Sequence, residues 1–306
     1  MAVTSVLLTI VGLTLFEIIS SIDNAIINAQ VLETMTLRAR RWFLTWGLFF
    51  AVVLVRGLLP WIVAWAAMPS LGPIGSLTAA FSSDPRVAQA LREQSPILLC
   101  GGGIFLVCLF LQWFMDERFM LSGNRTQGAS SMLRFVFPVS CVAVFSAMSF
   151  VAAELGHLGL IAAAAIGTAA FFAVHSVRMA AEKKEAELTD GTTAISDFGK
   201  IMFLQIIDAS FSIDGVIGAF AFTLSVPLIL VGNGIGAWVV RELTVKNSGK
   251  IASYPLLQNG AMYSIGILGT IMLAEAFGVE VKSWVSPLCT IAIVGFFLWK
   301  STRNQS

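Results

Sequence analysis

Long apolar runs separated by short polar segments dominate the pattern along this chain. A helix of about 20 apolar residues is long enough to cross the roughly 30 Å hydrocarbon core of a bilayer. Nine segments approach or exceed this length, at residues 3–32, 42–67, 97–115, 133–153, 158–177, 200–224, 226–247, 251–277 and 282–300. The pattern therefore predicts an all-α, polytopic transmembrane helix bundle of about nine spans.

Two polar segments predict how the chain is organised. Residues 68–96 are rich in Pro, Gly and Ser, which favours a long loop between the second and third spans. Residues 178–199 contain a cluster of Lys and Glu, which indicates a short solvated helix acting as a cytoplasmic linker. We therefore expect an N-terminal transmembrane half, 1–177, and a C-terminal transmembrane half, 200–306. The break near Glu154–His157 is so short that the fourth and fifth spans are not clearly separate.

Composition and charge agree with a membrane protein and narrow its partners to lipid and a small ion. Of the 306 residues, 57% are hydrophobic and only 12% are charged, whereas soluble domains are about one quarter charged. The formal net charge of +1 gives no reason to expect a nucleic-acid partner. The four cysteines lie in apolar runs without metal-ligand spacing, so we interpret them as small buried residues.

The basic residues predict the orientation in the membrane. With nine spans, 15 of the 19 Lys and Arg residues fall on one side and 3 on the other, while Arg56 lies within a span. Basic residues are retained on the cytoplasmic side. The N-terminus is therefore expected outside and the C-terminus in the cytoplasm, in what we expect to be the inner (plasma) membrane of a bacterium.

Two of the predicted spans carry carboxylates in nearly the same arrangement. The first contains FEIISSIDNAIINA from Phe16 to Ala29, and the sixth contains IDASFSIDGVIGAF from Ile207 to Phe220. An offset of 191 residues pairs Glu17 with Asp208, Ser21 with Ser212 and Asp23 with Asp214. Carboxylates inside membrane spans are rare and usually functional, so the matched acids predict a shared site.

Helical spacing adds an independent reason to group these residues. One polar stripe with spacings of three and four residues contains Thr14, Glu17, Ser21, Asn24 and Asn28. The matching stripe in the second copy contains Gln205, Asp208, Ser212 and Gly215. Asp23 and Asp214 lie at the edge of the stripe. Glu17 and Asp23 of the first helix would share one small ion more easily if that helix were unwound near Ser20–Ser21.

The first and sixth spans are separated by an odd number of steps, so the two copies are inverted. A second, weaker match at an offset of 185 pairs Gly47 with Gly232 and Arg56 with Arg241. Inverted repeats are common in secondary transporters, which bind their substrate near the membrane midplane between the repeats. We expect Arg56 either to pair with an acid or to extend to an interface.

SSIDNAIINA and FSIDG resemble the paired motifs of the TerC family of integral membrane proteins, over most of the chain. The resemblance implies a cation exporter built from inverted repeats. Members of that family are associated with manganese export, with loading of metal onto exported enzymes and with tellurium resistance. In this branch LQNGAMYSIG often carries an acidic–His pair, whereas this chain has Gln258 and Asn259, so a ligand role for that segment is not expected.

The chemistry of the predicted site favours a hard cation. Carboxylate, amide and hydroxyl oxygens suit Mn²⁺, with Ca²⁺ and Mg²⁺ as alternatives, and they do not suit copper or zinc. The expected metal-site residues are Glu17, Asp23, Asp208, Asp214, Asn24, Ser21, Ser212 and Asn28. Asn28 and Thr14 are equally well explained as hydrogen-bonding contacts between helices. No tightly bound cofactor is expected.

The leading hypothesis is a secondary transporter that exports a divalent cation, most readily Mn²⁺, by exchange with protons. Two alternatives remain open. Two intramembrane aspartates are also the catalytic residues of intramembrane aspartyl proteases. This chain lacks the Gly-x-Gly-Asp and Pro-Ala-Leu motifs, so no enzyme is predicted. The other alternative is a non-transporting membrane partner of secretion or stress machinery. The sequence does not predict the oligomeric state.

Overall fold

The computed structural model describes most of the helical regions of the chain. The described residues are 3–21, 28, 31–32, 35–50, 57–58, 61–62, 65, 72–81, 85–121, 127–189, 196–223, 225–251, 256–282 and 284–303. In parts of these helices only the backbone is described. Arg56 lies outside the described residues, so its predicted role is not addressed.

The described part of the chain is helical and contains no strand, which confirms the all-α fold class. The helices are α1 (Val3–Ser20), α3 (Leu37–Trp42), the π-helix η1 (Phe43–Gly47), α4 (Leu48–Phe50), α6 (Gly72–Phe81), α7 (Pro85–Leu121), α8 (Gln127–Glu154), α9 (Leu158–Thr189), α10 (Asp197–Ala219), α11 (Val226–Ile251), α12 (Leu256–Ala276) and α13 (Val285–Arg303). Among the described residues, five segments are long and apolar enough to cross a membrane, at Val3–Ser20, Ser95–Asp116, Phe135–Glu154, Leu158–Ala180 and Val285–Arg303. The number nine stays a prediction.

The prediction of a long loop at residues 68–96 is wrong. Helix α6 occupies Gly72–Phe81, and α7 begins at Pro85. Proline is favoured in the first turn of a helix because its missing N–H has no partner there in any case. Pro73 and Pro85 are therefore helix-start signals. Their presence beside Gly and Ser led the sequence pattern to suggest a loop.

Residues 178–189 are the C-terminal part of α9 and do not form a separate short helix. Residues 190–195 of the predicted linker lie outside the described residues. Whether 178–199 links two transmembrane halves stays a prediction, as does the division into 1–177 and 200–306.

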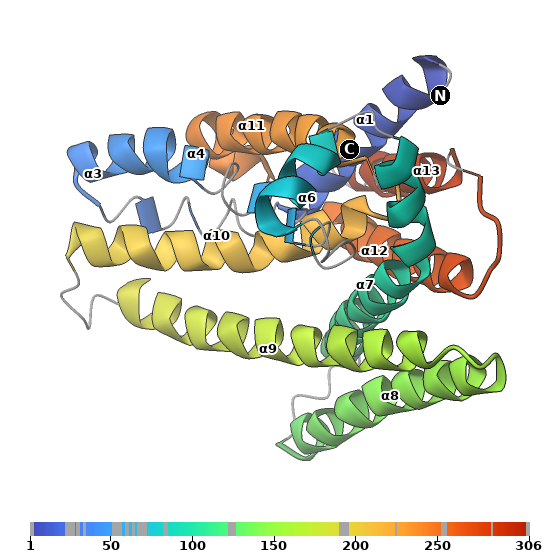
Figure 1. Ribbon diagram of the computed structural model, residues 1–306. Helices are drawn as coiled ribbons and strands as arrows, with labels where there is room; N and C mark the ends of the chain where they lie inside the picture. Colours follow the sequence, from blue (N-terminus) through green and yellow to red (C-terminus); the bar gives the residue numbers. More distant parts are fainter. Residues whose placement is uncertain are drawn as a thin grey trace.

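Helices α8 and α9 are separate and pack against each other as a hairpin at one edge of the bundle (Figure 1). Gly156 lies between them with a φ of 72°, a conformation that favours glycine. The backbone N–H groups of Gly156 and His157 donate to the carbonyls of Ala153 (3.0 Å) and Ala152 (2.9 Å). These two bonds terminate α8 and turn the chain back.

Contacts along the helices define their relative directions. Leu13 and Glu17 of α1 meet Gly232 and Gly236 of α11 in the same order, so α1 and α11 run in the same direction. Helix α10 runs the opposite way, because its Gly215 and Gly218 meet Ser20 and Phe16, respectively. Helix α1 therefore lies between a parallel neighbour and an antiparallel neighbour.

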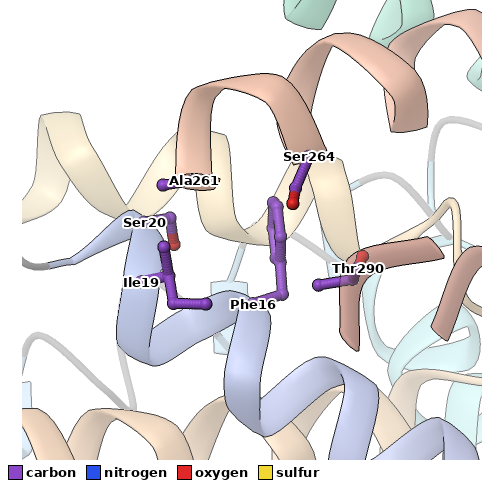
Figure 2. A pocket seen from close by; sticks show the side chains of 6 residues that line it. All are labelled: Phe16, Ile19, Ser20, Ala261, Ser264 and Thr290. Carbon is purple, nitrogen blue, oxygen red and sulfur yellow. The ribbon is translucent and has the colours of Figure 1, made fainter. Parts of the chain in front are cut away.

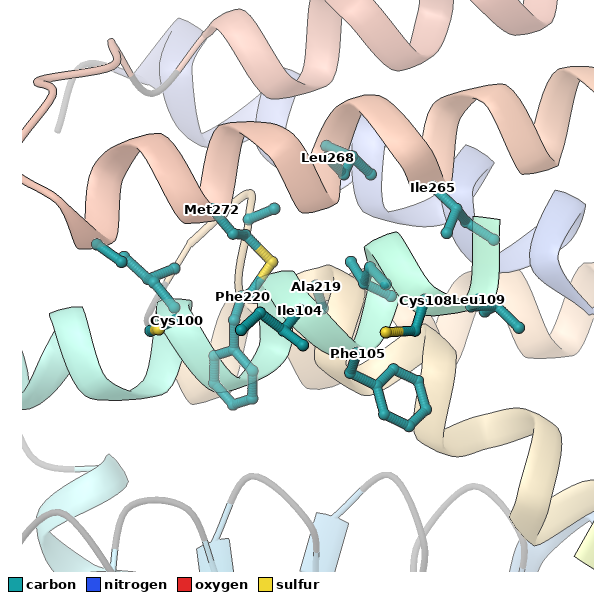
Figure 3. Packing of buried hydrophobic residues seen from close by; sticks show 14 of the residues in the cluster. Cys100, Ile104, Phe105, Cys108, Leu109, Ala219, Phe220, Ile265, Leu268 and Met272 are labelled. Carbon is teal, nitrogen blue, oxygen red and sulfur yellow. The ribbon is translucent and has the colours of Figure 1, made fainter. Parts of the chain in front are cut away.

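The hydrophobic core lies where α7, α10 and α12 meet (Figure 3). Ile104 and Phe105 of α7 lie close to Met272 of α12 and to Phe220, which follows the end of α10. Cys100, Cys108 and Cys141 are free thiols buried in this core. Their burial confirms the interpretation of these cysteines as small core residues, while Cys289 is half-buried.

Candidate functional site

Glu17 is the central feature of the candidate site, because its side chain is completely buried. Its exposed fraction is 0%, on a helix whose outward side chains are apolar. Its Oε1 accepts a hydrogen bond of 2.8 Å from the hydroxyl of Ser21, which is itself buried. Burying a carboxylate is unfavourable by several kcal/mol unless the charge is neutralised or strongly hydrogen-bonded.

Helix α1 ends beside this carboxylate. Its last helical residue is Ser20, and Ser21 is in a turn. The Ser20 hydroxyl donates a hydrogen bond of 3.3 Å to the backbone carbonyl of Glu17. The helix ends where unwinding would make it easier for Glu17 and Asp23 to share one ion. Helix ends leave backbone carbonyls without helical partners, and such carbonyls can bind cations in transporters.

Two neighbouring helices approach Glu17 through glycines. A Cβ atom built on Gly215 of α10 would lie 2.7 Å from Glu17 Oε2. One built on Gly236 of α11 would lie 2.6 Å from Glu17 Cβ. Thr14 donates a hydrogen bond of 3.2 Å to the backbone carbonyl of Gly232, which confirms its predicted role as a contact between helices. The missing side chains of these glycines leave the room that the Glu17 side chain occupies.

Three glycines recur at alternate positions of α11, at Gly232, Gly234 and Gly236, but only two of them face α1. Gly232 and Gly236 pack directly against Leu13 and Glu17. A Cβ on Gly234 would have no atom within 4 Å. Gly234 does not share this contact because alternate residues of a helix point about 200° apart.

The second acidic copy is only partly described. Asp208 is buried on α10, with an exposed fraction of 7%. The backbone of α10 continues as a helix through Ser212 and Asp214, so this copy has no break like that after Ser20. The side chains of Ser212 and Asp214, and the whole of Asp23 and Asn24, lie outside the described residues. The shared cluster of four acids therefore stays a prediction.

Several buried amide groups lie on the same helices or shortly after α1. Asn28 Oδ1 and Gln205 Nε2 have no hydrogen-bond partner among the described residues. Asn28 is itself buried. On α11, Asn233 has an exposed fraction of 0%, and neither its Oδ1 nor its Nδ2 has a partner in the described part of the chain. Buried polar groups without partners are uncommon and need an explanation.

Sequence reasoning missed Asn233 for an identifiable reason. The polar stripes were traced only on the two helices that carry acids, and α11 has no acid at this depth. The weaker repeat pairs Asn233 with Leu48, so repeat symmetry gives no signal either. Its position between Gly232 and Gly234, in an otherwise apolar stretch, was the available signal.

A small hollow lies beside the end of α1, where α12 and α13 cross it (Figure 2). Phe16, Ile19 and Ser20 of α1 face Ser264 and Thr290 across it. It encloses about 160 Å³ of empty space but is too narrow for a water molecule. In this conformation the hollow cannot hold an ion, so Glu17 remains the better candidate for the binding site.

A larger cavity of about 630 Å³ lies where α7, the turn between α8 and α9, and the end of α12 come together. Its lining includes Glu93, His157 and Glu275. His157 is exposed in the turn between α8 and α9. The described residues nevertheless contain no group of three or more His, Cys, Asp or Glu side chains close enough to hold a metal ion.

Long apolar helices with buried acids and amides between them define an integral membrane protein with a polar interior. Comparison with known proteins agrees with this class. The chain belongs to the DUF475 family, described as a protein of unknown function, whose sequence profile matches residues 22–306. Part of the chain is similar to the uncharacterized membrane protein YceF of Bacillus subtilis (strain 168), with 29% identity over 92 residues.

The similarity to YceF covers 30% of this chain and 36% of YceF, so the chain spans about a third of that relative's length. No solved structure matches the chain.

Proposed function

We propose that this protein is a secondary transporter that exports a divalent cation, with Mn²⁺ as the favoured substrate. The observation that carries the proposal is the fully buried Glu17 at the meeting point of α1, α10 and α11. Ser21, directly after the end of α1, donates a hydrogen bond to its carboxylate, and glycines of the two other helices make room for it. A residue whose only role was to fill space would not need a carboxylate here.

The ligand chemistry favours a hard cation. The buried polar side chains of α1, α10, α11 and the residues after α1 offer carboxylate, hydroxyl and amide oxygens, from Glu17, Asp208, Ser21, Asn28 and Asn233. The buried cysteines lie in the core of α7, α8 and α12. Oxygen-only sites suit Mn²⁺, Mg²⁺ and Ca²⁺ better than copper or zinc.

Contacts between the proposed repeats support an inverted arrangement. The two offsets pair Thr14 with Gln205 and Gly47 with Gly232. Thr14 of α1 bonds to Gly232 of α11, and a Cβ on Gly47 would lie 2.7 Å from Gln205 Nε2 of α10. Each contact is therefore the counterpart of the other under the repeat. The antiparallel packing of α1 and α10 agrees with the same symmetry.

The proposed exchange of the cation for protons follows from the negative charge of the carboxylates. Several carboxylates around one divalent ion would leave excess negative charge in a site with little water. At least one acid is therefore expected to hold a proton, and departure of the cation would allow further protonation. The TerC resemblance agrees with cation export, and the similarity to a membrane protein agrees with a role in the membrane. The side of the membrane that each terminus faces stays a prediction.

The test is Mn²⁺ transport by the purified protein in proteoliposomes, with internal Mn²⁺ and internal pH recorded by fluorescent dyes. Glu17→Gln and Asp208→Asn should each lower Mn²⁺ flux at least about tenfold, because they remove charge with little change in shape. Asp23→Asn and Asp214→Asn should do the same if the four acids form one site. Glu154→Gln, at an exposed position at the end of α8, should transport normally.

Three results would contradict parts of the proposal. Wild-type protein that moves no divalent cation would rule out transport and favour a non-transporting partner. Mn²⁺ flux without any pH change would remove the proton exchange alone. Normal flux in both Glu17→Gln and Asp208→Asn would show that the buried acids are structural.

A further inference from the structure

Asn233 is the most completely buried amide that the predicted site did not include. Its exposed fraction is 0%, and neither Oδ1 nor Nδ2 has a hydrogen-bond partner among the described residues. An amide can donate two hydrogen bonds and accept two. Leaving a buried polar group without its partner is unfavourable by about 1–3 kcal/mol. This position therefore reduces stability unless something else uses the amide.

The position of Asn233 on α11 relates it to Glu17. Residues three apart in a helix share a face, so Asn233 lies on the same side of α11 as Gly236, one turn earlier. Gly236 packs against the Cβ and Cγ atoms of Glu17, at 2.6 and 2.7 Å from an ideal Cβ. Gly232, directly before Asn233, packs against Leu13 and accepts the hydrogen bond from Thr14. Asn233 therefore lies about one helical turn along α11 from the residue that packs against the acid.

A purely structural role explains this side chain poorly. Asparagines that join membrane helices do so through hydrogen bonds across the interface. Asn233 makes none with the described residues, whereas Thr14, one turn from Glu17, does bond across the same interface. A leucine has the same branched outline and would fill the space without an unsatisfied amide. A buried amide without a partner among the described residues, one helical turn from the residue that packs against a buried acid, is better explained by ligand binding.

We propose that Asn233 is a ligand of the transported cation, binding it through Oδ1 on the α11 side of Glu17. The inference rests on the proposed function and adds a third helix to the predicted site. An amide oxygen is a hard ligand, as Mn²⁺, Mg²⁺ and Ca²⁺ require, and it adds no negative charge to a site already rich in carboxylates. The repeat gives it no polar counterpart, since Leu48 occupies the matched position, so the site has one ligand that only the C-terminal repeat supplies.

The experiment measures thermal unfolding of the detergent-solubilised full chain, with and without Mn²⁺, for wild type and Asn233→Leu. Without metal, the variant should melt at the same temperature or higher, because an unsatisfied amide is removed. Its affinity for Mn²⁺, measured from the concentration dependence of the melting shift, should fall on the order of tenfold to a hundredfold. Ser301→Ala is the control, because Ser301 Oγ is also buried without a partner but lies near the end of α13.

A second variant keeps the inference testable if Asn233→Leu does not fold. Asn233→Asp retains an oxygen at the same place and adds a titratable charge. It should still bind Mn²⁺, with an affinity that depends more steeply on pH than that of wild type. Affinity and pH dependence equal to those of wild type would overturn the ligand role.

The outcomes separate the two proposals. Wild-type protein without any Mn²⁺-induced shift would overturn the proposed function, and the ligand role with it. A normal shift in wild type that is equally large in Asn233→Leu would overturn the ligand role alone. A lower melting temperature without metal, together with an unchanged affinity, would show that Asn233 joins helices.

Discussion

Glycines allow close helix packing in two regions of this protein, which we call the α7 crossing and the α1 crossing. The two crossings differ in the groups that the glycines approach. Around α7, Gly103 approaches the carbonyl oxygen of Gly269 on α12, with 3.0 Å from an ideal Cβ, and Gly101 approaches α9. Around α1, Gly215 and Gly236 approach a carboxylate side chain. The first crossing brings backbone against backbone within an apolar core. The second makes room for an acid.

The difference shows that glycine alone does not indicate a functional site. Close packing of helices needs small residues in any membrane bundle, and the α7 crossing uses them for that purpose alone. At the α1 crossing the same device makes room for the buried carboxylate of Glu17. Substitutions at matched glycines should therefore affect stability at one crossing and ion binding at the other.

The largest effect is expected at the α7 crossing, for Gly167→Ala. A Cβ on Gly167 of α9 would overlap the backbone carbonyl of Gly101, which no side-chain movement can relieve. We expect a loss of about 3 kcal/mol in the free energy of unfolding, or failure to accumulate in the membrane. Thermal unfolding in detergent and the amount of folded protein would measure this.

Gly295→Ala on α13 is the matched control, because no atom lies within 4 Å of the Cβ it would add. It should leave the melting temperature unchanged or slightly higher. If Gly167→Ala were as stable as this control, α7 and α9 would not pack as closely as described.

An intermediate effect is expected for Gly236→Ala at the α1 crossing. The new methyl group would meet Glu17 Cβ and Cγ at 2.6 and 2.7 Å and the carbonyl oxygen of Thr14 at 2.9 Å, so α1 and α11 would have to move slightly apart. We expect about 1–2 kcal/mol of destabilisation. Displacement of the carboxylate should also lower Mn²⁺ affinity by about tenfold. Unchanged affinity with reduced stability would make this crossing equivalent to that around α7.

Parts of this comparison follow from the sequence and parts do not. The spacing of Thr14, Glu17 and Ser21 predicts one polar helix face, and the structure places Thr14 and Glu17 against α11. The burial of Glu17 follows from its position in an apolar run. The contribution of α11 could not be predicted, because Asn233 has neither a charge nor a polar partner in the repeat. The role of its side chain depends on which helix it packs against.

The errors have a similar physical origin. Pro, Gly and Ser at residues 68–96 indicate a loop by composition, but Pro73 and Pro85 lie in the first turns of α6 and α7, where proline is compatible with a helix. Gly234 lies in a regular alternation with Gly232 and Gly236, yet it points away from α1. Local composition shows which residues are small or break helices, whereas the effect of each depends on its angular position and on its neighbours.

The smallest effect is expected for Gly234→Ala, on the same helix as Gly236. Its added methyl group would have no atom within 4 Å, and alanine favours the helix over glycine by about 0.5–1 kcal/mol. The variant should therefore melt slightly higher than wild type, with Mn²⁺ affinity and flux unchanged. Because Gly234→Ala and Gly236→Ala stiffen α11 equally, they differ only in contact with Glu17. If Gly234→Ala impaired Mn²⁺ flux as much as Gly236→Ala, the glycines would act through the flexibility of α11, and the contrast between the two crossings would fail.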